Sequence, residues 1–140
     1  MIVFDASTLV GAAIRRNGIP QQAFLHALAT DTLALSQPVV AELLEVFHRP
    51  RLMRYLDAEL RAEILGQMFS LGVTIDPAVR VTDCRDAKDN IYLELALAAG
   101  ATTIVSSDAD LLVLHPWRGV RILRPADYLT FAAGMPGSGT

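Results

Sequence analysis

The chain has 140 residues, of which 52% are apolar, 19% charged and 6% aromatic, and its formal net charge is −3. This length suits one domain, and the apolar content is too high for a disordered chain. The excess of acids excludes a surface that is strongly basic over the whole molecule, as many nucleic-acid-binding proteins have. We therefore expect a single domain at residues 1–133, followed by a flexible tail at residues 134–140.

Short apolar runs alternate with helical periodicity along the chain. The runs predict strands at residues 2–4, 33–35, 73–75, 102–106 and 120–123. Helices are predicted at residues 8–17, 20–29, 36–49, 57–70 and 86–99, with a short helical turn after residue 110 and a last helix from Pro125. This alternation favours the α/β class, with a parallel sheet of about five strands covered by helices on both faces.

No apolar segment reaches the roughly 18 residues that a membrane span requires, because acidic residues interrupt the longest ones. The first residues lack the basic flank of a signal peptide, so we expect a cytoplasmic protein without membrane contact. The lone cysteine, Cys84, has no partner for a disulfide or a thiolate metal cage. We expect it to be buried as a small apolar residue.

Four acidic residues from distant positions are expected at the carboxyl edge of the sheet, where open α/β folds build their sites. Asp5 ends the first strand, and Asp108 follows the fourth strand. Asp89 opens the helix that leads into the fourth strand, so a right-handed crossover places it at the same edge. Glu42 lies near the start of a helix that also follows a strand, which makes it a better candidate than Glu45.

Carboxylates that converge on one place repel one another unless a cation joins them. Mg²⁺ and Mn²⁺ prefer such oxygen ligands, and they activate water and stabilise charge when a phosphodiester is attacked. The chain has no cluster of histidines and cysteines, which argues against zinc. It also has no serine triad, Walker loop or GxGxxG motif. The acids therefore predict a Mg²⁺ or Mn²⁺ site.

Each acid also has a structural interpretation. Asp5 could be a turn residue, and Asp89 could favour the start of a helix through its negative charge. Asp108 and Asp110 could cap a turn, and Asp86 fits a helix cap better than a metal ligand. The isolated histidines fit surface or packing positions, and they are His26, His48 and His115.

Four segments occur in an order and in a secondary-structure setting that are jointly specific, although each segment alone is common. They are Ile2–Thr8, Val40–Leu43, Asp86–Asn90 and Ile104–Leu112. Together they resemble the PIN-domain (PilT N-terminus-like) family, and within it the bacterial and archaeal toxins of toxin–antitoxin pairs. The resemblance extends over residues 2–128.

This resemblance implies a three-layer α/β/α fold and a metal-dependent endoribonuclease that leaves 5′-phosphate and 3′-hydroxyl ends. An additional acid that is frequent in the family corresponds to Asp110. The acidic quartet that binds Mg²⁺ or Mn²⁺ in the family corresponds to Asp5, Glu42, Asp89 and Asp108.

Polar residues beside these acids are expected to support the site. Ser7 or Thr8 corresponds to a supporting hydroxyl of the family. Ser106 stands where the family usually has threonine at a strand end, and it keeps the hydroxyl. Asp86 and Asn90 belong to the third motif, where we expect them to support the acid between them.

An acidic site needs basic residues nearby before RNA phosphates can approach it. The residues expected to contact RNA are Arg49, Arg51, Arg54 and Lys88. Each of them also fits an ordinary solvent-exposed surface. The resemblance further implies a homodimer and, for the toxins, an antitoxin that covers the acidic groove.

Two other functions remain as alternatives. A non-catalytic PIN-fold module for protein binding would not need all four acids, so their presence favours the nuclease. A phosphohydrolase of the haloacid dehalogenase type also has an aspartate after its first strand. That class needs a second acid two residues later, where this chain has Ser7.

Overall fold

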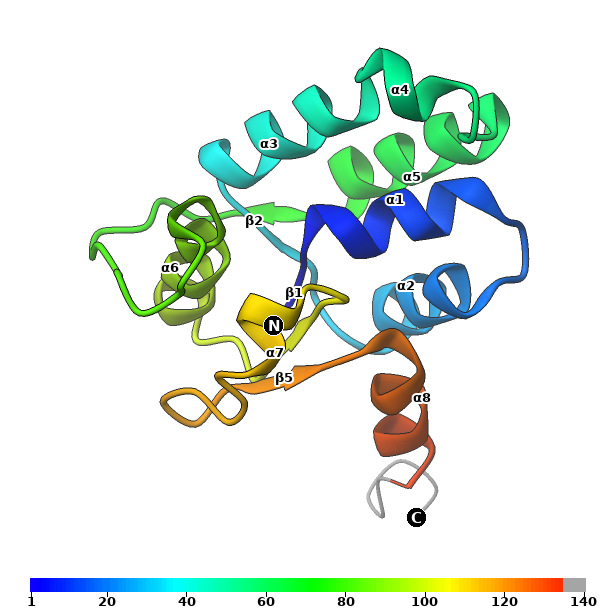
Figure 1. Cartoon of the computed structure of the whole chain (residues 1–140). Coiled ribbons are helices and arrows are strands. Elements are labelled where there is room, and N and C mark those ends of the chain that lie inside the picture. The colour runs from blue at the N-terminus through cyan, green and yellow to red at the C-terminus, as the bar shows by residue number, and fades with distance from the viewer. Residues whose placement is uncertain (135–140) are drawn as a thin grey trace.

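Three short parallel strands form the central sheet of the computed structural model, which describes residues 1–134 (Figure 1). In order across the sheet they are β1 (Ile2–Phe4), β4 (Thr103–Val105) and β5 (Arg121–Leu123). Ile2 lies opposite Thr103, which in turn lies opposite Arg121. The fourth strand of the chain is therefore in the middle of the sheet, beside the first.

The other two strands, β2 (Ala34–Leu35) and β3 (Val73–Thr74), form a separate parallel pair. A single parallel bridge between Ile2 and Leu33 connects this pair to the central sheet. The α/β class is confirmed, but the prediction of about five strands in one sheet is wrong. Pairing with β1 ends at this bridge, and the next two residues, Ala34 and Leu35, pair with β3 instead before Ser36 caps the following helix.

Helices connect the strands, as the alternating sequence pattern predicts. In chain order they are α1 (Ala6–Ile14), α2 (Ile19–Thr30), α3 (Gln37–Phe47), α4 (Pro50–Met53), α5 (Ala58–Leu71), the 3₁₀ helix η1 (Ala87–Asp89), α6 (Asn90–Ala99), α7 (Ala109–Leu112) and α8 (Pro125–Ala133). The helix α4 was not predicted. The preceding helix ends at Phe47, and Pro50 begins a new short helix, where its missing N–H has no hydrogen bond to lose.

Helices cover both faces of the central sheet and give the three-layer arrangement. Successive side chains of β1 enter two different apolar clusters, because neighbouring strand residues point to opposite faces. Ile2 and Phe4 pack with α1, α2, α3, α5 and α8. Val3 packs in the second cluster, with Leu93 of α6 and Ile104 of β4. Figure 1 shows α6 on one side of the sheet, with α1 and α2 on the other.

The end of the described chain lies in α8. The N–H of Gly134 donates a hydrogen bond to the Thr130 carbonyl at 3.1 Å, so the first residue of the expected tail closes this helix. The rest of that tail, residues 135–140, lies outside the described residues.

Two further predictions concern the cysteine and the membrane. Cys84 is buried, as predicted. Within residues 1–134, no helix has both the length and the apolar character needed to cross a membrane.

Candidate functional site

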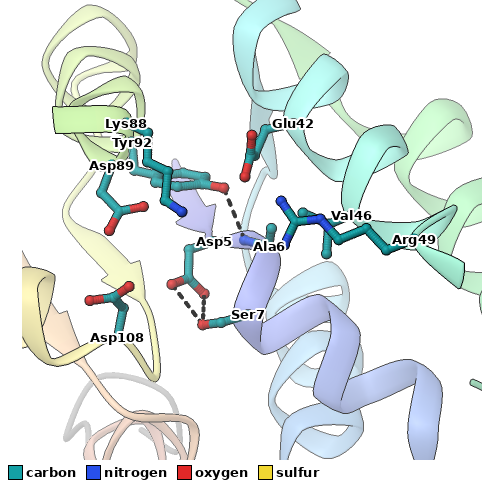
Figure 2. Close-up of a pocket in the computed structure, with 10 residues that line it drawn as sticks. All are labelled: Asp5, Ala6, Ser7, Glu42, Val46, Arg49, Lys88, Asp89, Tyr92 and Asp108. Atoms are coloured by element: carbon teal, nitrogen blue, oxygen red, sulfur yellow. Dashed lines mark hydrogen bonds between the residues drawn. The ribbon is translucent and has the colours of Figure 1, made fainter. Parts of the chain in front are cut away.

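An acidic pocket of about 150 Å³ opens where β1 and β4 end (Figure 2). It lies at the carboxyl edge of the sheet, where the sequence places the acids. All four predicted acids line it, and they come from four different segments of the chain. The residues that line the acidic pocket are Asp5, Ala6, Ser7, Glu42, Val46, Arg49, Lys88, Asp89, Tyr92 and Asp108.

Asp5 is the most firmly held of these acids. It follows β1 directly and caps α1, with its Oδ1 accepting the Thr8 N–H at 3.0 Å. The Ser7 hydroxyl donates to the same carboxylate at 2.9 Å, and the Ser106 hydroxyl donates to Oδ2. Burial, with only 2% of the residue exposed, raises the pKa of Asp5, and the hydrogen bonds oppose this rise. Three of the predicted supporting hydroxyl residues therefore contact one carboxylate.

Ser106 also connects Asp5 to the next acid. Its Oγ accepts the N–H of Asp108 at 2.9 Å while its proton goes to Asp5. Asp108 in turn caps α7, because its Oδ1 accepts the Asp110 N–H at 2.8 Å. The structural interpretation of Asp108 as a cap is therefore correct, and the residue still faces the pocket.

Asp89 lacks the support that Asp5 has. The residue is 8% exposed, and its Oδ2 is buried without a hydrogen-bond partner among the described residues. Its pKa is raised to about 7, first by burial and then by the negative charge of Asp108. Among residues 1–134, Asp89 therefore lies near other negative charges and forms no ion pair within 4.0 Å.

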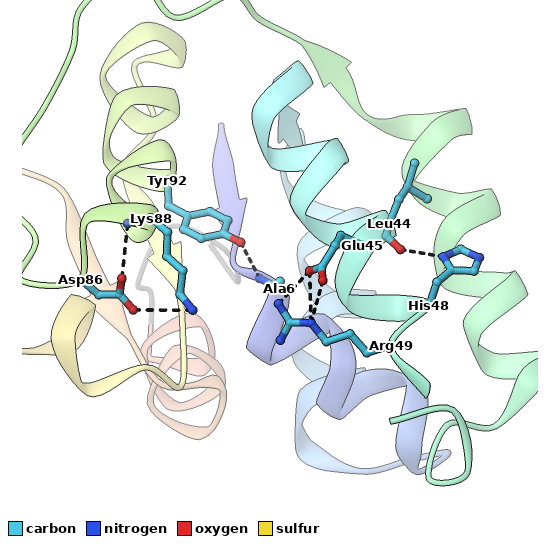
Figure 3. A network of polar contacts seen from close by, with 8 residues as sticks. All are labelled: Ala6, Leu44, Glu45, His48, Arg49, Asp86, Lys88 and Tyr92. Atoms are coloured by element: carbon cyan, nitrogen blue, oxygen red, sulfur yellow. Dashed lines mark hydrogen bonds and ion pairs between the residues drawn. The ribbon is translucent and has the colours of Figure 1, made fainter. Parts of the chain in front are cut away.

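Glu42 approaches from the opposite wall of the pocket. It lies on α3, half-buried, and Figure 2 shows its carboxylate directed toward Asp5 and Asp89. Glu45, one turn further along the same helix, is exposed and pairs with Arg49 at 2.7 Å (Figure 3). The structure thus separates the two glutamates as the sequence analysis expected.

The donor set of the pocket fits a hard divalent ion, although the side chains do not enclose one. In the part of the chain that the structure describes, no three histidine, cysteine, aspartate or glutamate side chains are placed to hold a metal together. Mg²⁺ and Mn²⁺ are commonly held by one or two carboxylates, with water completing the shell. The unpartnered Oδ2 of Asp89, close to the charges of Asp108 and Asp5, is where a cation would relieve the greatest repulsion.

Two cations line the acidic pocket together with the acids. Figure 2 shows Lys88 and Arg49 extending toward it from opposite sides. Lys88 pairs loosely with Asp86 at 3.9 Å, and Arg49 pairs with Glu45 (Figure 3). The amino group and the guanidinium therefore lie at the pocket, and within residues 1–134 neither forms an ion pair with Asp89.

The other predicted residues lie beside the pocket. Asp86 accepts the N–H of Lys88 and so caps η1, which agrees with its interpretation as a cap. The Oδ1 of Asn90 accepts the Cys84 N–H at 2.8 Å and fixes the preceding loop. Asp110 is half-buried but is not part of the pocket wall. Arg51 and Arg54 line a neighbouring surface pocket instead.

Tyr92 is a pocket residue that the sequence analysis missed. It lies one turn after Asp89 on the same face of α6, and its Oη accepts the Ala6 N–H at 3.1 Å. Burial raises the pKa of its phenol, and the nearby carboxylates add to this rise. The spacing of three residues between Asp89 and Tyr92 is the signal that would have found it.

Fold and pocket together define a parallel α/β domain with buried carboxylates at the carboxyl edge of its sheet. A family model of the PIN domain matches residues 1–110, a range that contains all four pocket acids. The chain belongs to the PIN domain family.

The chain is also similar to proteins of known sequence or structure. The uncharacterized protein MJ1680 of Methanocaldococcus jannaschii is 30% identical over 116 residues, which cover 81% of this chain and 74% of that protein. The crystal structure of PAE2754 from Pyrobaculum aerophilum is 16% identical, with a TM-score of 0.59 over 94% of this chain and 89% of the other. The crystal structure of VapBC2 from Rickettsia felis contains a DNA fragment from the promoter of VapBC2. The matched chain of that structure is 17% identical, with a TM-score of 0.54 over 87% of this chain and 97% of the other. Both solved structures share the fold.

Proposed function

We propose that this PIN domain is a metal-dependent endoribonuclease that uses Mg²⁺ or Mn²⁺. The observation that carries the proposal is the electrostatic state of the acidic pocket. Asp89 is buried beside Asp108 with an unpartnered oxygen and a pKa raised to about 7. Buried like charges are costly for a folded protein, and a divalent cation is the ligand that removes this cost. The proposed metal ligands are Asp5, Glu42, Asp89 and Asp108.

Different residues of the chain would bind the metal ion and the phosphates around the reacting one. When bound, Mg²⁺ or Mn²⁺ would activate a water and offset charge on the phosphodiester. Asp5 is fixed by hydrogen bonds from the Ser7 and Ser106 hydroxyls, so it supplies a ligand that needs no reorganisation. Lys88 and Arg49, at the sides of the pocket, would bind the flanking phosphates. Asp110 would serve as an additional ligand only with its side chain turned toward the pocket, which it does not line here.

We further propose that the chain is the toxin of a toxin–antitoxin pair. The order of the four sequence motifs and the fold similarity to VapBC2 support this role. A cognate antitoxin would cover the acidic pocket, and we expect the protein to form a homodimer. Coexpression with a neighbouring gene product, followed by purification of an inactive complex, would support the pairing.

A cleavage assay tests the nuclease directly. Total RNA incubated with the wild-type protein and Mn²⁺ should be cut to fragments with 5′-phosphate ends, and EDTA should stop the reaction. Asp89→Asn and Glu42→Gln should each slow cleavage by about 100-fold or more. Asp57→Asn is the control for loss of an acid outside the pocket, because Asp57 caps α5 and does not line the pocket. Full activity of both pocket variants would contradict the proposal.

A PIN-fold module that only binds protein is the second candidate function. The observation in its favour is that, among residues 1–134, the acidic side chains do not enclose a metal position. This candidate predicts that the purified protein binds neither Mn²⁺ nor RNA, and that Asp89→Asn leaves the capture of its partner unchanged.

A further inference from the structure

The segment that follows α3 carries a second pocket, which we call the arginine pocket. Its volume is about 330 Å³, and it shares one lining residue, Arg49, with the acidic pocket. The residues that line the arginine pocket are Arg49, Arg51, Leu52, Arg54 and Tyr55. Two pockets that share a wall can contact neighbouring groups of a single extended ligand.

Tyr55 is the unusual member of this set. It is 58% exposed, so its ring contributes little to the apolar core. The Cζ atom of Arg54 lies 5.2 Å from the centroid of this ring, in a cation–π contact. Large exposed aromatic rings beside cations are platforms on which nucleic-acid bases stack.

The charges around Tyr55 are available to a ligand. Among residues 1–134, neither Arg51 nor Arg54 takes part in an ion pair, whereas Arg49 is paired with Glu45. Both free guanidinium groups are exposed on the short α4 segment. A flat ring flanked by unpaired guanidinium groups matches a nucleotide, which offers a planar base and a phosphate together. An acidic peptide would use the arginines but would leave the ring without a planar partner.

We propose that the arginine pocket binds one unpaired nucleotide of the RNA, with its base stacked on Tyr55 and its phosphate against Arg51 and Arg54. The substrate is therefore single-stranded at this position, because a base inside a duplex is not free to stack on a side chain. This inference rests on the proposed nuclease function, because Arg49 lines both pockets and would connect the nucleotide to a phosphate in the acidic pocket.

Binding of a fluorescent oligoribonucleotide tests the inference without requiring cleavage. The probe is a short single-stranded RNA that carries one 2-aminopurine, whose fluorescence falls when it stacks on an aromatic ring. It is measured in EDTA and again in Mn²⁺ with the Asp89→Asn protein. The wild-type protein should bind the single strand with quenching and should bind the same sequence as a duplex at least about tenfold more weakly.

Substitutions at Tyr55 separate stacking from simple charge attraction. Tyr55→Ala should weaken binding about tenfold and remove the quenching, whereas Tyr55→Phe should retain both. Phe69→Ala is the matched control, because Phe69 is 57% exposed but does not line the pocket. Arg54→Ala should weaken binding and make its salt dependence less steep.

The outcomes distinguish this inference from the proposed function. Unchanged binding by Tyr55→Ala, equal binding of the duplex, or displacement of the probe by a polyglutamate peptide as readily as by unlabelled RNA would each overturn the nucleotide site. RNA cleavage by the wild-type protein together with unchanged binding by Tyr55→Ala would overturn this inference alone. Quenching that depends on Tyr55 in a protein that cuts no RNA would overturn the nuclease and support the site.

Discussion

The acidic pocket has two unlike sides. On one side, Asp5 accepts hydrogen bonds from the side chains of Ser7 and Ser106 and from the Thr8 backbone. On the other side, Asp89 has a buried oxygen with no partner among the described residues, beside the charge of Asp108. The hydrogen bonds make the first carboxylate part of the folded framework, whereas the second carboxylate is buried without such support. The comparison teaches that two acids of one pocket differ in what holds them: hydrogen bonds from the fold fix Asp5, whereas the buried Oδ2 of Asp89 has none among the described residues.

The largest expected effect comes from removing the framework acid. Asp5→Ala removes the cap of α1 and leaves buried donors of Ser106 and Thr8 without an acceptor. We expect the free energy of unfolding to fall by about 2–4 kcal/mol, measured by urea denaturation. Asp57→Ala, which removes only an exposed cap, should cost about 1 kcal/mol. Equal losses in the two variants would contradict the division between the sides of the pocket.

Removing the charge of Asp89 is expected to have the opposite effect and to stabilise the metal-free protein. The pKa of Asp89 rises from 3.8 to about 7 on folding, so the folded protein holds this proton more tightly than the unfolded chain. In EDTA, the melting temperature should therefore fall as the pH rises from about 4 to about 7, and then level off. Asp89→Asn should reduce this slope and raise the melting temperature at pH 8 by a few degrees. A metal-free protein that becomes steadily more stable over this range would contradict the assignment.

Tyr92 connects the two sides, because it lies on the helix of Asp89 and bonds to the start of α1. Tyr92→Phe keeps the ring and leaves the buried Ala6 N–H without its acceptor. We expect a loss of about 1–2 kcal/mol in the free energy of unfolding. Tyr55→Phe, which removes an exposed hydroxyl, should have no measurable effect on stability and serves as the control.

The smallest expected effect on stability comes from the exposed ion pair between Glu45 and Arg49. Glu45→Gln removes the exposed ion pair with Arg49, which should change the free energy of unfolding by less than about 0.5 kcal/mol. The same change frees the guanidinium beside both pockets, so binding of single-stranded RNA at low salt should become stronger. Weaker RNA binding by this variant would show that Arg49 depends on Glu45 for its position.

The sequence was sufficient to predict which acids meet, because topology alone brings them together. Asp5 and Asp108 follow strands, and the carboxyl ends of parallel strands share one edge. The sequence was not sufficient to predict that the sheet divides, because it does not show that β2 keeps only one bridge to β1 and pairs with β3 instead. Short apolar runs predict where the five strands lie, but they do not indicate whether the strands join in one sheet.

Side-chain contacts were the other limit of sequence analysis. The spacing of the chain places Arg51 and Arg54 near Arg49, yet only the turn of α4 moves them away from the acidic pocket to a pocket of their own. The hydrogen bond between Tyr92 and Ala6 joins residues 86 positions apart, which no local pattern predicts. The distances among the acids likewise depend on side-chain rotamers and not on the order of the strands.

Calorimetric titration with Mn²⁺ tests the central claim most directly, using the wild-type protein beside Asp5→Asn, Asp89→Asn and the control Asp57→Asn. The account predicts that the wild type and Asp57→Asn bind Mn²⁺ alike and that both pocket variants bind it more weakly, with the proton on Asp89 released as the ion enters. Binding that neither pocket substitution weakens would place the metal elsewhere and contradict the assignment of the acidic pocket.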